Sequence, residues 1–326
     1  MKAIVSERYG PPESLQFVEV EKPIPKENEV LIKVHASSLN AADFEILRGA
    51  WTARFTGLRK PGQKIPGSDV AGTIEAVGNS VTTFQPGDEV MGDLFYSGKG
   101  AFAEFVSAPE KVLTYKPAKM TFAEAATYPQ AGIIALQALR GERQIQPEQK
   151  VLVNGAGGGM GTFAVQIAKY YDAEVTGVDS EMKLDMLRSI GADHVIDYAE
   201  EDFTKSSQCY DIIIDTVAKR SIYDYEHTLC EGGLFVMVGG SRKAIFQAVF
   251  LGPWISRRGT KKLGLNLWGE PYNQADMDFL EELYNTGKVM PVIDRKYRLS
   301  EVPEAYQYLE EGKALGKLVV TMEEYL

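Results

Sequence analysis

The sequence predicts an α/β protein of two domains, in which a β-rich domain is followed by a doubly wound parallel sheet. Three observations carry this prediction. The chain has 326 residues, and a single hydrophobic core rarely grows beyond about 250–300 residues. Up to about residue 120, short strand-like runs are separated by tight turns, whereas strand-like and helix-like segments alternate after Thr121. Such alternation implies right-handed crossovers and a parallel sheet.

The composition is that of an ordinary soluble protein, 44% hydrophobic and 25% charged. A net charge of −10 argues against nonspecific binding to nucleic acid or to an anionic membrane. Two cysteines, Cys209 and Cys230, cannot build a disulfide framework, which favours a reducing compartment. No signal-peptide pattern is present, and the longest apolar stretch, Ala244 to Ile255, is too short to span a bilayer. We therefore expect a cytoplasmic protein with neither nucleic acid nor membrane as a partner.

The first 120 residues are strand-rich and irregular. Leu15 to Val20, Val30 to Val34 and Gly67 to Gly78 are predicted strands, and Pro86-Gly87-Asp88 is a predicted turn. Asn40-Ala41-Ala42-Asp43 resembles a helix N-cap with an acidic residue at N3, and predicts a short helix. The pattern indicates a small β-barrel.

The second part begins with a capping box at Thr121–Glu124, which opens a predicted helix to Pro129. The elements predicted after it are the helix Ala131–Leu139, the strands Val151–Asn154, Glu174–Asp179, His194–Asp197, Tyr210–Asp215 and Leu234–Gly239, the helices Gly158–Tyr171, Glu181–Ile190 and one from Ser221, then the helices Gln274–Thr286 and Val302–Glu311 and the strand Lys317–Met322. Residues 241–273 show no clear pattern. Their basic group Arg257–Lys262 suggests either a lid or phosphate contact or, as the better interpretation, a surface loop or subunit contact.

Five glycines fall within the seven positions from Gly155 to Gly161, between a predicted strand and a predicted helix. Glycine lets the backbone turn sharply and approach a pyrophosphate, whose charge then rests on the free N–H groups at the helix N-terminus. The spacing fits both Gly155-x-x-Gly158-x-x-Gly161 and Ala156-x-Gly158-x-x-Gly161. A lone glycine motif also occurs in ordinary tight turns, so its function depends on the rest of the chain.

Several motifs in one order resemble the medium-chain dehydrogenases/reductases, and more narrowly their zinc-free quinone oxidoreductase-like branch. The matching segments are Asn154–Lys169, Gly67–Gly78, Pro86–Val90, Gly191–Tyr198, Tyr210–Val217, Gly287–Asp294 and Gly316–Val320. The resemblance implies a GroES-like β-barrel catalytic domain over residues 1–121 and 290–326 and a Rossmann cofactor domain over residues 122–289. It also implies a homodimer.

The resemblance places the zinc ligands of zinc-dependent relatives, two cysteines and a histidine, at Asn40, Gln130 and Ser68 of this chain. Amides and hydroxyls are poor substitutes for thiolate and imidazole ligands. Cys209 and Cys230 are too few for the four-cysteine structural zinc lobe of such relatives. We therefore expect no zinc and no other metal.

Without a metal as Lewis acid, the substrate must supply its own electrophilicity. The leading hypothesis is NAD(P)H-dependent hydride transfer to a quinone or an α,β-unsaturated carbonyl (enone or enal).

Asn40 and Gln130 are the candidate catalytic residues, because the resemblance places them beside nicotinamide and substrate. The Asn40 side chain could instead, or also, cap its helix. Tyr96 and Tyr128 are weaker candidates as proton donors, since most tyrosines only pack. Two alternatives stay open: an acyl-thioester enoyl reductase, and an NADPH-binding sensor or interaction protein with little turnover.

The two nicotinamide cofactors are favoured by different residues. Asp179 follows Gly161 by 18 positions, and an acid there favours NADH because it bonds the ribose 2′-OH and repels a 2′-phosphate. The resemblance matches Ser180, Lys183 and Tyr198 to 2′-phosphate contacts and so favours NADPH, which we expect, with NADH as a second cofactor. Lys183 could also be a solvated lysine on a helix, and Lys317 could be either a pyrophosphate contact or a surface lysine. The remaining expected cofactor contacts are Asn154, Gly155, Ala156, Gly158, Gly159, Met160, Gly161, Thr216, Val217, Val238, Gly239 and Gly240.

Overall fold

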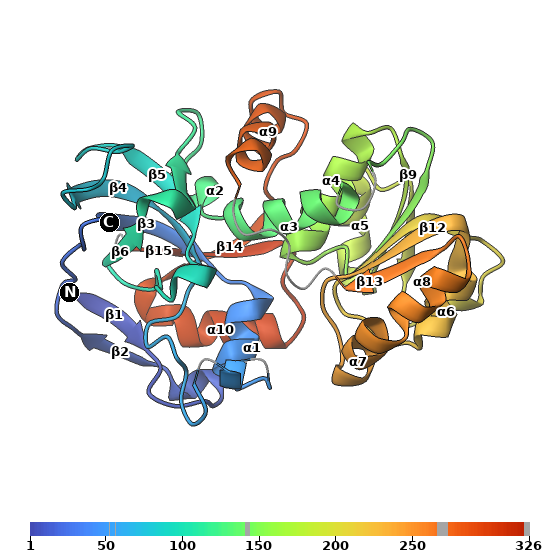
Figure 1. The fold of residues 1–326 in the computed structure, drawn as a ribbon, viewed down its shortest axis with the longest axis horizontal. Helices are drawn as coiled ribbons and strands as arrows, with labels where there is room; N and C mark the ends of the chain where they lie inside the picture. Colours follow the sequence, from blue (N-terminus) through green and yellow to red (C-terminus); the bar gives the residue numbers. More distant parts are fainter. Residues whose placement is uncertain (52, 56, 141–143, 266–272, 323–326) are drawn as a thin grey trace. The chain divides into compact units, whose positions relative to one another are not determined.

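The computed structural model describes residues 1–51, 53–55, 57–140, 144–265 and 273–322. The chain forms two compact units (Figure 1). Unit 1 comprises Met1–Ala131, Tyr272–Glu281 and Ile293–Leu326, and unit 2 comprises Gly132–Pro271 and Glu282–Val292. The domain boundaries expected at residues 121/122 and 289/290 stay a prediction.

Unit 1 is organised by a mainly antiparallel sheet in the order β14-β15-β3-β4-β5-β7, with β6 also paired to β3. These strands are β3 (Glu29–Ser38), β4 (Asp69–Val77), β5 (Glu89–Asp93), β6 (Phe105–Pro109), β7 (Leu113–Tyr115), β14 (Ile293–Arg298) and β15 (Lys317–Thr321). A separate pair is formed by β1 (Lys2–Val5) and β2 (Gln16–Glu19), and the helices are α1 (Ala41–Leu47), α2 (Phe122–Ala125) and α10 (Val302–Glu310). Inward-facing residues of β3 and β4, such as Ile32 and Ile74, share one core. Because β15 pairs antiparallel with residues 36–38 of β3, the start of β15 lies beside the end of β3.

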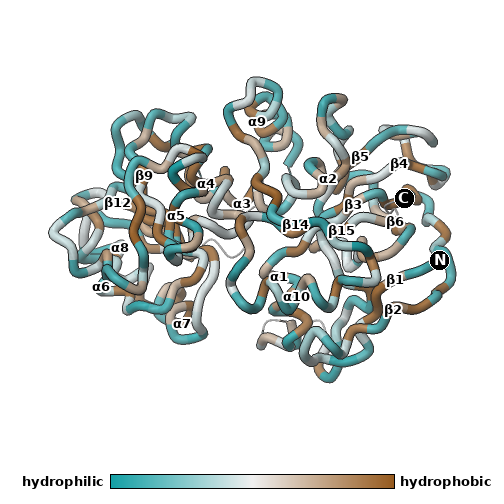
Figure 2. Tube along the Cα trace, turned by 180° about the vertical axis from the view of Figure 1, so that it is seen from behind, coloured by the Kyte–Doolittle hydropathy of each residue, from teal (hydrophilic) through white to brown (hydrophobic). Residues whose placement is uncertain are grey.

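Unit 2 contains a six-stranded parallel sheet in the order β10-β9-β8-β11-β12-β13. The strands are β8 (Lys150–Asn154), β9 (Glu174–Asp179), β10 (His194–Asp197), β11 (Tyr210–Asp215), β12 (Leu229–Met237) and β13 (Lys262–Leu265). The accompanying helices are α4 (Gly159–Tyr170), α5 (Glu181–Ser189), α6 (Ile222–Thr228), α7 (Arg242–Phe250) and α8 (Gly252–Arg258), while α3 (Pro129–Arg140) and α9 (Gln274–Asn285) each include residues of both units. Hydrophobic stretches run along the central strands (Figure 2). The strand order reverses between β8 and β11, the place where open α/β sheets bind ligands at the carboxyl ends of their strands. The predicted fold class is confirmed.

Of the two structures expected for residues 241–273, the surface loop was wrong for the described part, residues 241–265, because that segment forms α7, α8 and the edge strand β13. The subunit contact stays a prediction. The Ser241 side chain accepts a hydrogen bond from the Ala244 N–H, which caps α7, and Ala248 and Ile255 are buried. Residues 266–272 lie outside the described part of the chain. The helix expected from Thr121 to Pro129 ends at Ala125, and Pro129 instead begins α3.

Cys209 and Cys230 form a disulfide, with their Cα atoms 5.0 Å apart. Cys230 belongs to β12 and Cys209 immediately precedes β11, so the bond joins neighbouring strands at their amino-terminal ends. The pairing removes the support that the cysteine count gave to a reducing compartment. None of the described helices has the length and hydropathy needed to cross a bilayer.

Candidate active site and cofactor loop

The glycine loop follows β8 and leads directly into α4. Gly155 has a φ of +79°, a left-handed conformation that favours glycine. A Cβ on Gly161 would lie 2.3 Å from the Gly155 carbonyl oxygen and 2.6 Å from that of Ala156, so no side chain fits there. Gly158 is the N-cap of α4. The loop therefore brings backbone close to the positive end of a helix, which suits a pyrophosphate.

Asp179 and Lys183, the residues predicted to favour different cofactors, form one ion pair beside this loop. The Lys183 Nζ atom lies 3.4 Å from Asp179 Oδ1, and each residue is only 7% exposed. Asp179 Oδ2 accepts a hydrogen bond from the Gly157 N–H at 2.8 Å, and Oδ1 accepts one from the Ser180 N–H. The interpretation of Lys183 as a solvated surface charge was wrong. Tyr198 is 58% exposed, and its N–H donates to the Asp179 carbonyl.

Asp215 connects the end of β11 to Asn154, the last residue of β8 before the glycine loop, a role that the sequence did not reveal. Its Oδ2 atom accepts hydrogen bonds from Asn154 Nδ2 at 2.8 Å and from the Tyr225 hydroxyl at 2.7 Å. Burial raises the pKa of this carboxyl, although its hydrogen bonds oppose the shift. The Thr216 hydroxyl donates to the Asn154 carbonyl, and the Val217 N–H donates to Asp215 Oδ1. The Gly239 N–H also donates to the Asp215 carbonyl. Four of the expected cofactor contacts therefore lie close together around Asp215: Asn154, Thr216, Val217 and Gly239. The sequence did contain a signal for this role, because Asp215 is an acid at the end of a buried strand.

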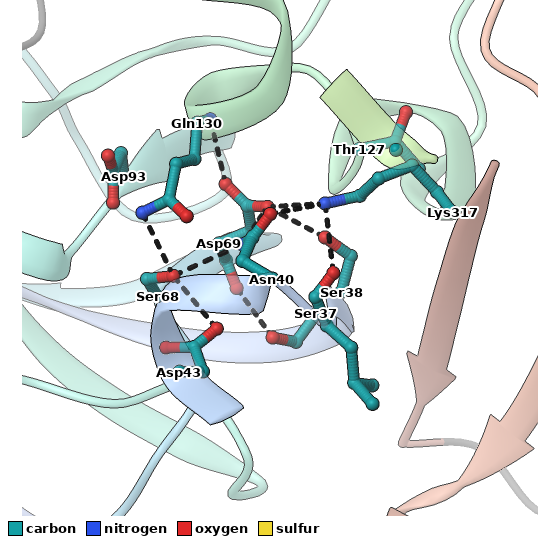
Figure 3. Close-up of polar contacts among 12 residues, drawn as sticks. Ser37, Ser38, Asn40, Asp43, Ser68, Asp69, Asp93, Thr127, Gln130 and Lys317 are labelled. Atoms are coloured by element: carbon teal, nitrogen blue, oxygen red, sulfur yellow. Dashed lines mark hydrogen bonds and ion pairs between the residues drawn. The ribbon is translucent and has the colours of Figure 1, made fainter. Parts of the chain in front are cut away.

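Unit 1 contains a buried polar cluster that we call the Ser68 cluster, consisting of Asn40, Asp43, Ser68, Asp69, Gln130 and Lys317 (Figure 3). Its members come from four places in the chain: the start of α1, the start of β4, the first turn of α3 and the first residue of β15. The pairing of β15 with β3, and of β3 with β4, brings these places together.

Asn40 and Gln130 point their amide groups at the same hydroxyl. Asn40 Nδ2 lies 3.2 Å and Gln130 Nε2 lies 3.3 Å from Ser68 Oγ. Asn40 Nδ2 also donates to Asp69 Oδ2 at 2.8 Å, and the Gln130 backbone N–H donates to Asp69 Oδ1 at 3.0 Å. Asn40 is the N-cap residue of α1, but its side chain makes no capping hydrogen bond, so the capping interpretation of that side chain was wrong.

Lys317 is 1% exposed, so the surface-lysine interpretation was wrong. Its ammonium group donates to the Asn40 side-chain oxygen at 2.6 Å, to Asp69 Oδ2 at 3.2 Å and to the Leu39 carbonyl at 3.2 Å. An ammonium group has three donors. All three are therefore used within unit 1.

Two carboxyl groups in this region have raised pKa values. Burial, together with the negative charge of Asp69, raises the pKa of Asp43 to about 7. The same two causes raise the pKa of Asp93, which lies near Gln130 in Figure 3. The Ser68 hydroxyl donates to Asp43 Oδ2 at 3.1 Å. Sequence reasoning treated Asp43 only as a helix residue and did not single out Asp69 or Asp93.

The other predicted residues lie outside the cluster. Tyr128 is fully buried and Tyr96 is 52% exposed. The basic group Arg257–Lys262 is divided between the end of α8 and the start of β13, and the Arg258 guanidinium stacks on Trp254 at 4.1 Å.

The residues at the zinc-ligand positions do not fit a zinc ion. Asn40, Ser68 and Gln130 offer amide and hydroxyl groups that bond one another, and an ammonium group lies among them. Within the described ranges, no three His, Cys, Asp or Glu side chains are grouped as metal ligands.

Comparisons with known proteins agree with this architecture. The family model of the alcohol dehydrogenase GroES-like domain matches residues 26–118, and that of the zinc-binding dehydrogenases matches residues 190–320. The chain is 33% identical to the chloroplast envelope quinone oxidoreductase homolog of Arabidopsis thaliana, over 94% of this chain and 93% of that protein. It is also 33% identical to the 2-methylene-furan-3-one reductase of Solanum lycopersicum, over 98% of this chain and 79% of that protein. The quinone oxidoreductase structure from Coxiella burnetii matches with a TM-score of 0.87 and 30% identity, over 99% of both chains.

Proposed function

Because the chain belongs to the medium-chain dehydrogenase/reductase superfamily, in its quinone oxidoreductase-like branch, we propose that it reduces a quinone or an α,β-unsaturated carbonyl with NAD(P)H and without a metal. The bound nicotinamide would supply the hydride. The quinone reductases and the furanone reductase among the relatives support both substrate classes. An acyl-thioester enoyl reductase and a binding protein with little turnover are the alternatives to be tested against it.

The buried ammonium of Lys317 is the observation that most supports a reaction without a metal. Its positive charge already lies against Asn40 and Asp69, whose oxygens it occupies. A divalent cation in the same place would be repelled by this charge, and the amide and hydroxyl groups at the three zinc-ligand positions are poor ligands for it. A substrate with built-in electrophilicity needs no Lewis acid, so quinones and enones fit this site better than simple alcohols do.

The cofactor would rest on the glycine loop of unit 2. Glycine at position 161 keeps the loop against α4, and the N-terminus of that helix would hold the pyrophosphate. The Asp179–Lys183 pair would meet the adenosine ribose. Lys183 partly neutralises Asp179, which supports NADPH as the preferred cofactor with NADH as a usable second one.

In unit 1, Asn40 and Gln130 would act as positioning residues. Both hydrogens of the Asn40 amide are used on Ser68 and Asp69, and its oxygen accepts from Lys317. The Gln130 amide also donates to Ser68. These bonds hold the Ser68 hydroxyl in one place, and Ser68 stands at a zinc-ligand position of the zinc-dependent relatives, so Ser68 is the group that we expect to face the substrate.

The test is a fluorescence titration of the purified protein with NADPH and with NADH, followed by a panel of quinones, enones, enoyl thioesters and aldehydes. We expect micromolar binding, turnover of quinones or neutral enones, and activity that a chelator leaves unchanged. Failure to bind either cofactor would contradict the proposal. Faster turnover of enoyl thioesters than of neutral enones would favour the thioester alternative, and binding without turnover would favour the sensor. Light scattering in the same buffer tests the expected homodimer.

A further inference from the structure

Ser68 lies between a pair of amide donors and a buried acid. The Asn40 and Gln130 amides approach its oxygen at 3.2 and 3.3 Å, and its hydroxyl donates to Asp43 Oδ2 at 3.1 Å (Figure 3). Two N–H dipoles directed at one oxygen stabilise negative charge on it, so they make the hydroxyl a better proton donor. The arrangement therefore favours the release of a proton from Ser68, with an acid close by to replace it.

Asp43 is the member of the cluster best suited to hold that replacement proton. It is 5% exposed. The nearby Lys317 ammonium donates its three hydrogen bonds to Leu39, Asn40 and Asp69 and none to Asp43. The groups that act on Asp43 are Asp69 and Lys317, while Tyr306 and Asp93 in turn feel its charge. Burial and the charge of Asp69 raise the pKa of Asp43 to about 7, so a large fraction of the molecules carries the proton at neutral pH.

A cavity beside Asp43 can resupply the proton. It is lined by Ser6, Asp43, Ile46, Leu47, Pro61, Gln63 and Pro66 and has about 20 Å³ of room for the centre of a water molecule. That is enough for one water, and the polar residues of the lining offer it several hydrogen-bond partners. Asp43 thus contacts Ser68 and also lines a space for water.

We propose that Ser68 and Asp43 form the proton path of the reduction, Ser68 donating to the substrate oxygen and Asp43 restoring the proton of Ser68. This inference rests on the proposed function. The bound nicotinamide would supply a hydride, and the acceptor that takes up its two electrons would become an oxyanion, either a hydroquinone anion or an enolate. The Ser68 O–H bond then breaks as the substrate O–H bond forms, the Asp43 proton moves to Ser68 Oγ, and water in the cavity returns a proton to Asp43. The net reaction consumes one NAD(P)H and one solvent proton for each acceptor reduced.

The path requires a reversal of one hydrogen bond. When Asp43 carries the proton it donates to Ser68 Oγ, which frees the Ser68 hydrogen for the substrate. A hydroxyl oxygen has two lone pairs, so one of its two amide contacts must then lengthen. These contacts, at 3.2 and 3.3 Å, are already long for a hydrogen bond, so either can give way.

The test compares quinones whose hydroquinone anions differ in basicity. The variants Asp43→Asn and Ser68→Ala should each lower kcat about 10²-fold or more for a methylated quinone, since general acid catalysis raises a rate about 10²–10⁴-fold. The loss should shrink severalfold for a tetrahalogenated quinone, whose anion needs no proton donor. The fall of wild-type kcat/KM above about pH 7 should disappear in Asp43→Asn, while NADPH affinity stays unchanged. Ser68→Thr should recover part of the activity that Ser68→Ala loses.

The matched control is the buried pair of Ser107 and Glu29 in the same sheet. The Ser107 hydroxyl donates to Glu29 Oε2 at 2.6 Å, and neither residue belongs to the Ser68 cluster. Ser107→Ala and Glu29→Gln should therefore keep the wild-type dependence on quinone and on pH, even if they lower stability. An Asp43→Asn enzyme that loses activity equally on all quinones, or keeps the wild-type pH profile, would overturn the proton path alone. A wild-type protein without turnover on any acceptor would overturn the proposed function together with it.

Discussion

The Lys317 ammonium lies 3.2 Å from the Asp69 carboxylate, and the two side chains are 1% and 0% exposed. Removing one partner of a buried ion pair leaves the other charge without compensation, which costs about 3–5 kcal/mol. Lys317→Met should therefore lower the free energy of unfolding by about that amount, measured by urea denaturation. The control is Arg188→Met, because Arg188 pairs with Asp185 on the surface, at 56% and 99% exposure. That variant should lose less than about 1 kcal/mol, and equal losses would contradict the assignment.

Gly161 and Gly158 should respond differently to one added methyl group. A Cβ on Gly161 would lie 2.3 Å from a carbonyl oxygen, whereas a Cβ on Gly158 would meet nothing closer than 3.4 Å. Gly161→Ala should therefore lower stability and abolish NADPH binding. Gly158→Ala should unfold like the wild type in urea but bind NADPH more weakly, because its backbone faces the expected pyrophosphate. Normal cofactor binding by Gly161→Ala would refute the role of this loop.

The Asp179–Lys183 pair should set the choice of cofactor. Asp179→Ala should weaken NADH binding more than NADPH binding, because the carboxylate that it removes would bond a ribose 2′-OH and repel a 2′-phosphate. Lys183→Met should do the opposite. Both variants also disturb the ion pair and the Gly157 contact, so the informative quantity is the ratio of the two dissociation constants. An unchanged ratio in either variant would contradict the assignment for that residue.

Asp43 should give the protein a stability that falls as the pH rises. An aspartate in the unfolded chain ionises near pH 4, whereas burial and Asp69 raise the pKa of folded Asp43 to about 7. Between these values unfolding releases a proton, so the folded state loses stability with rising pH, and above about pH 7 the effect is constant. Asp43→Asn should accordingly gain stability relative to the wild type from pH 4 to pH 7.

Asp202 supplies the comparison for this pH series. Burial alone would raise its pKa, but hydrogen bonds from Thr204 and the charge of Arg220 outweigh that effect and lower it. The stabilisation that ionised Asp202 contributes to the folded state is therefore fully present above about pH 4. The stability difference between Asp202→Asn and the wild type should stay flat from pH 5 to pH 7, and a flat difference for Asp43→Asn as well would show that folded Asp43 is ionised.

The disulfide should contribute measurably to the stability of unit 2. Cys209 and Cys230 are separated by 21 positions, and closing a loop of that size restricts the unfolded chain by about 3 kcal/mol. Oxidised wild-type protein should therefore unfold at higher urea concentration than Cys230→Ser or than wild-type protein kept in dithiothreitol. Coincident unfolding curves in all three conditions would show that the bond does not form in solution.

Local patterns were enough to predict the fold class and the glycine loop, because both depend on residues close together in the chain. Strand and helix periods identified most of the parallel sheet, and Gly155 to Gly161 marked the turn from β8 into α4. The Ser68 cluster is different. Lys317 and Asp69 are 248 positions apart, so neither the burial of the lysine nor its partner could be read from its neighbours. Asp43 occupies an ordinary N3 position, and only the pairing of β3 with β4 brings Ser68 to it. The cysteines were misjudged for the same reason, since their contact depends on the register of β11 and β12.

The placement of Lys317 in β15 also has a consequence for protein synthesis. A ribosome makes Asn40, Ser68 and Asp69 early and residue 317 last among the members of the cluster. Until then Asp69 lacks the Lys317 ammonium, and β3 lacks the partner strand that carries this lysine. The complete segment for unit 2 leaves the ribosome before that point, so its sheet can fold first. We therefore expect the proposed cofactor site to form on the growing chain before the Ser68 cluster is complete.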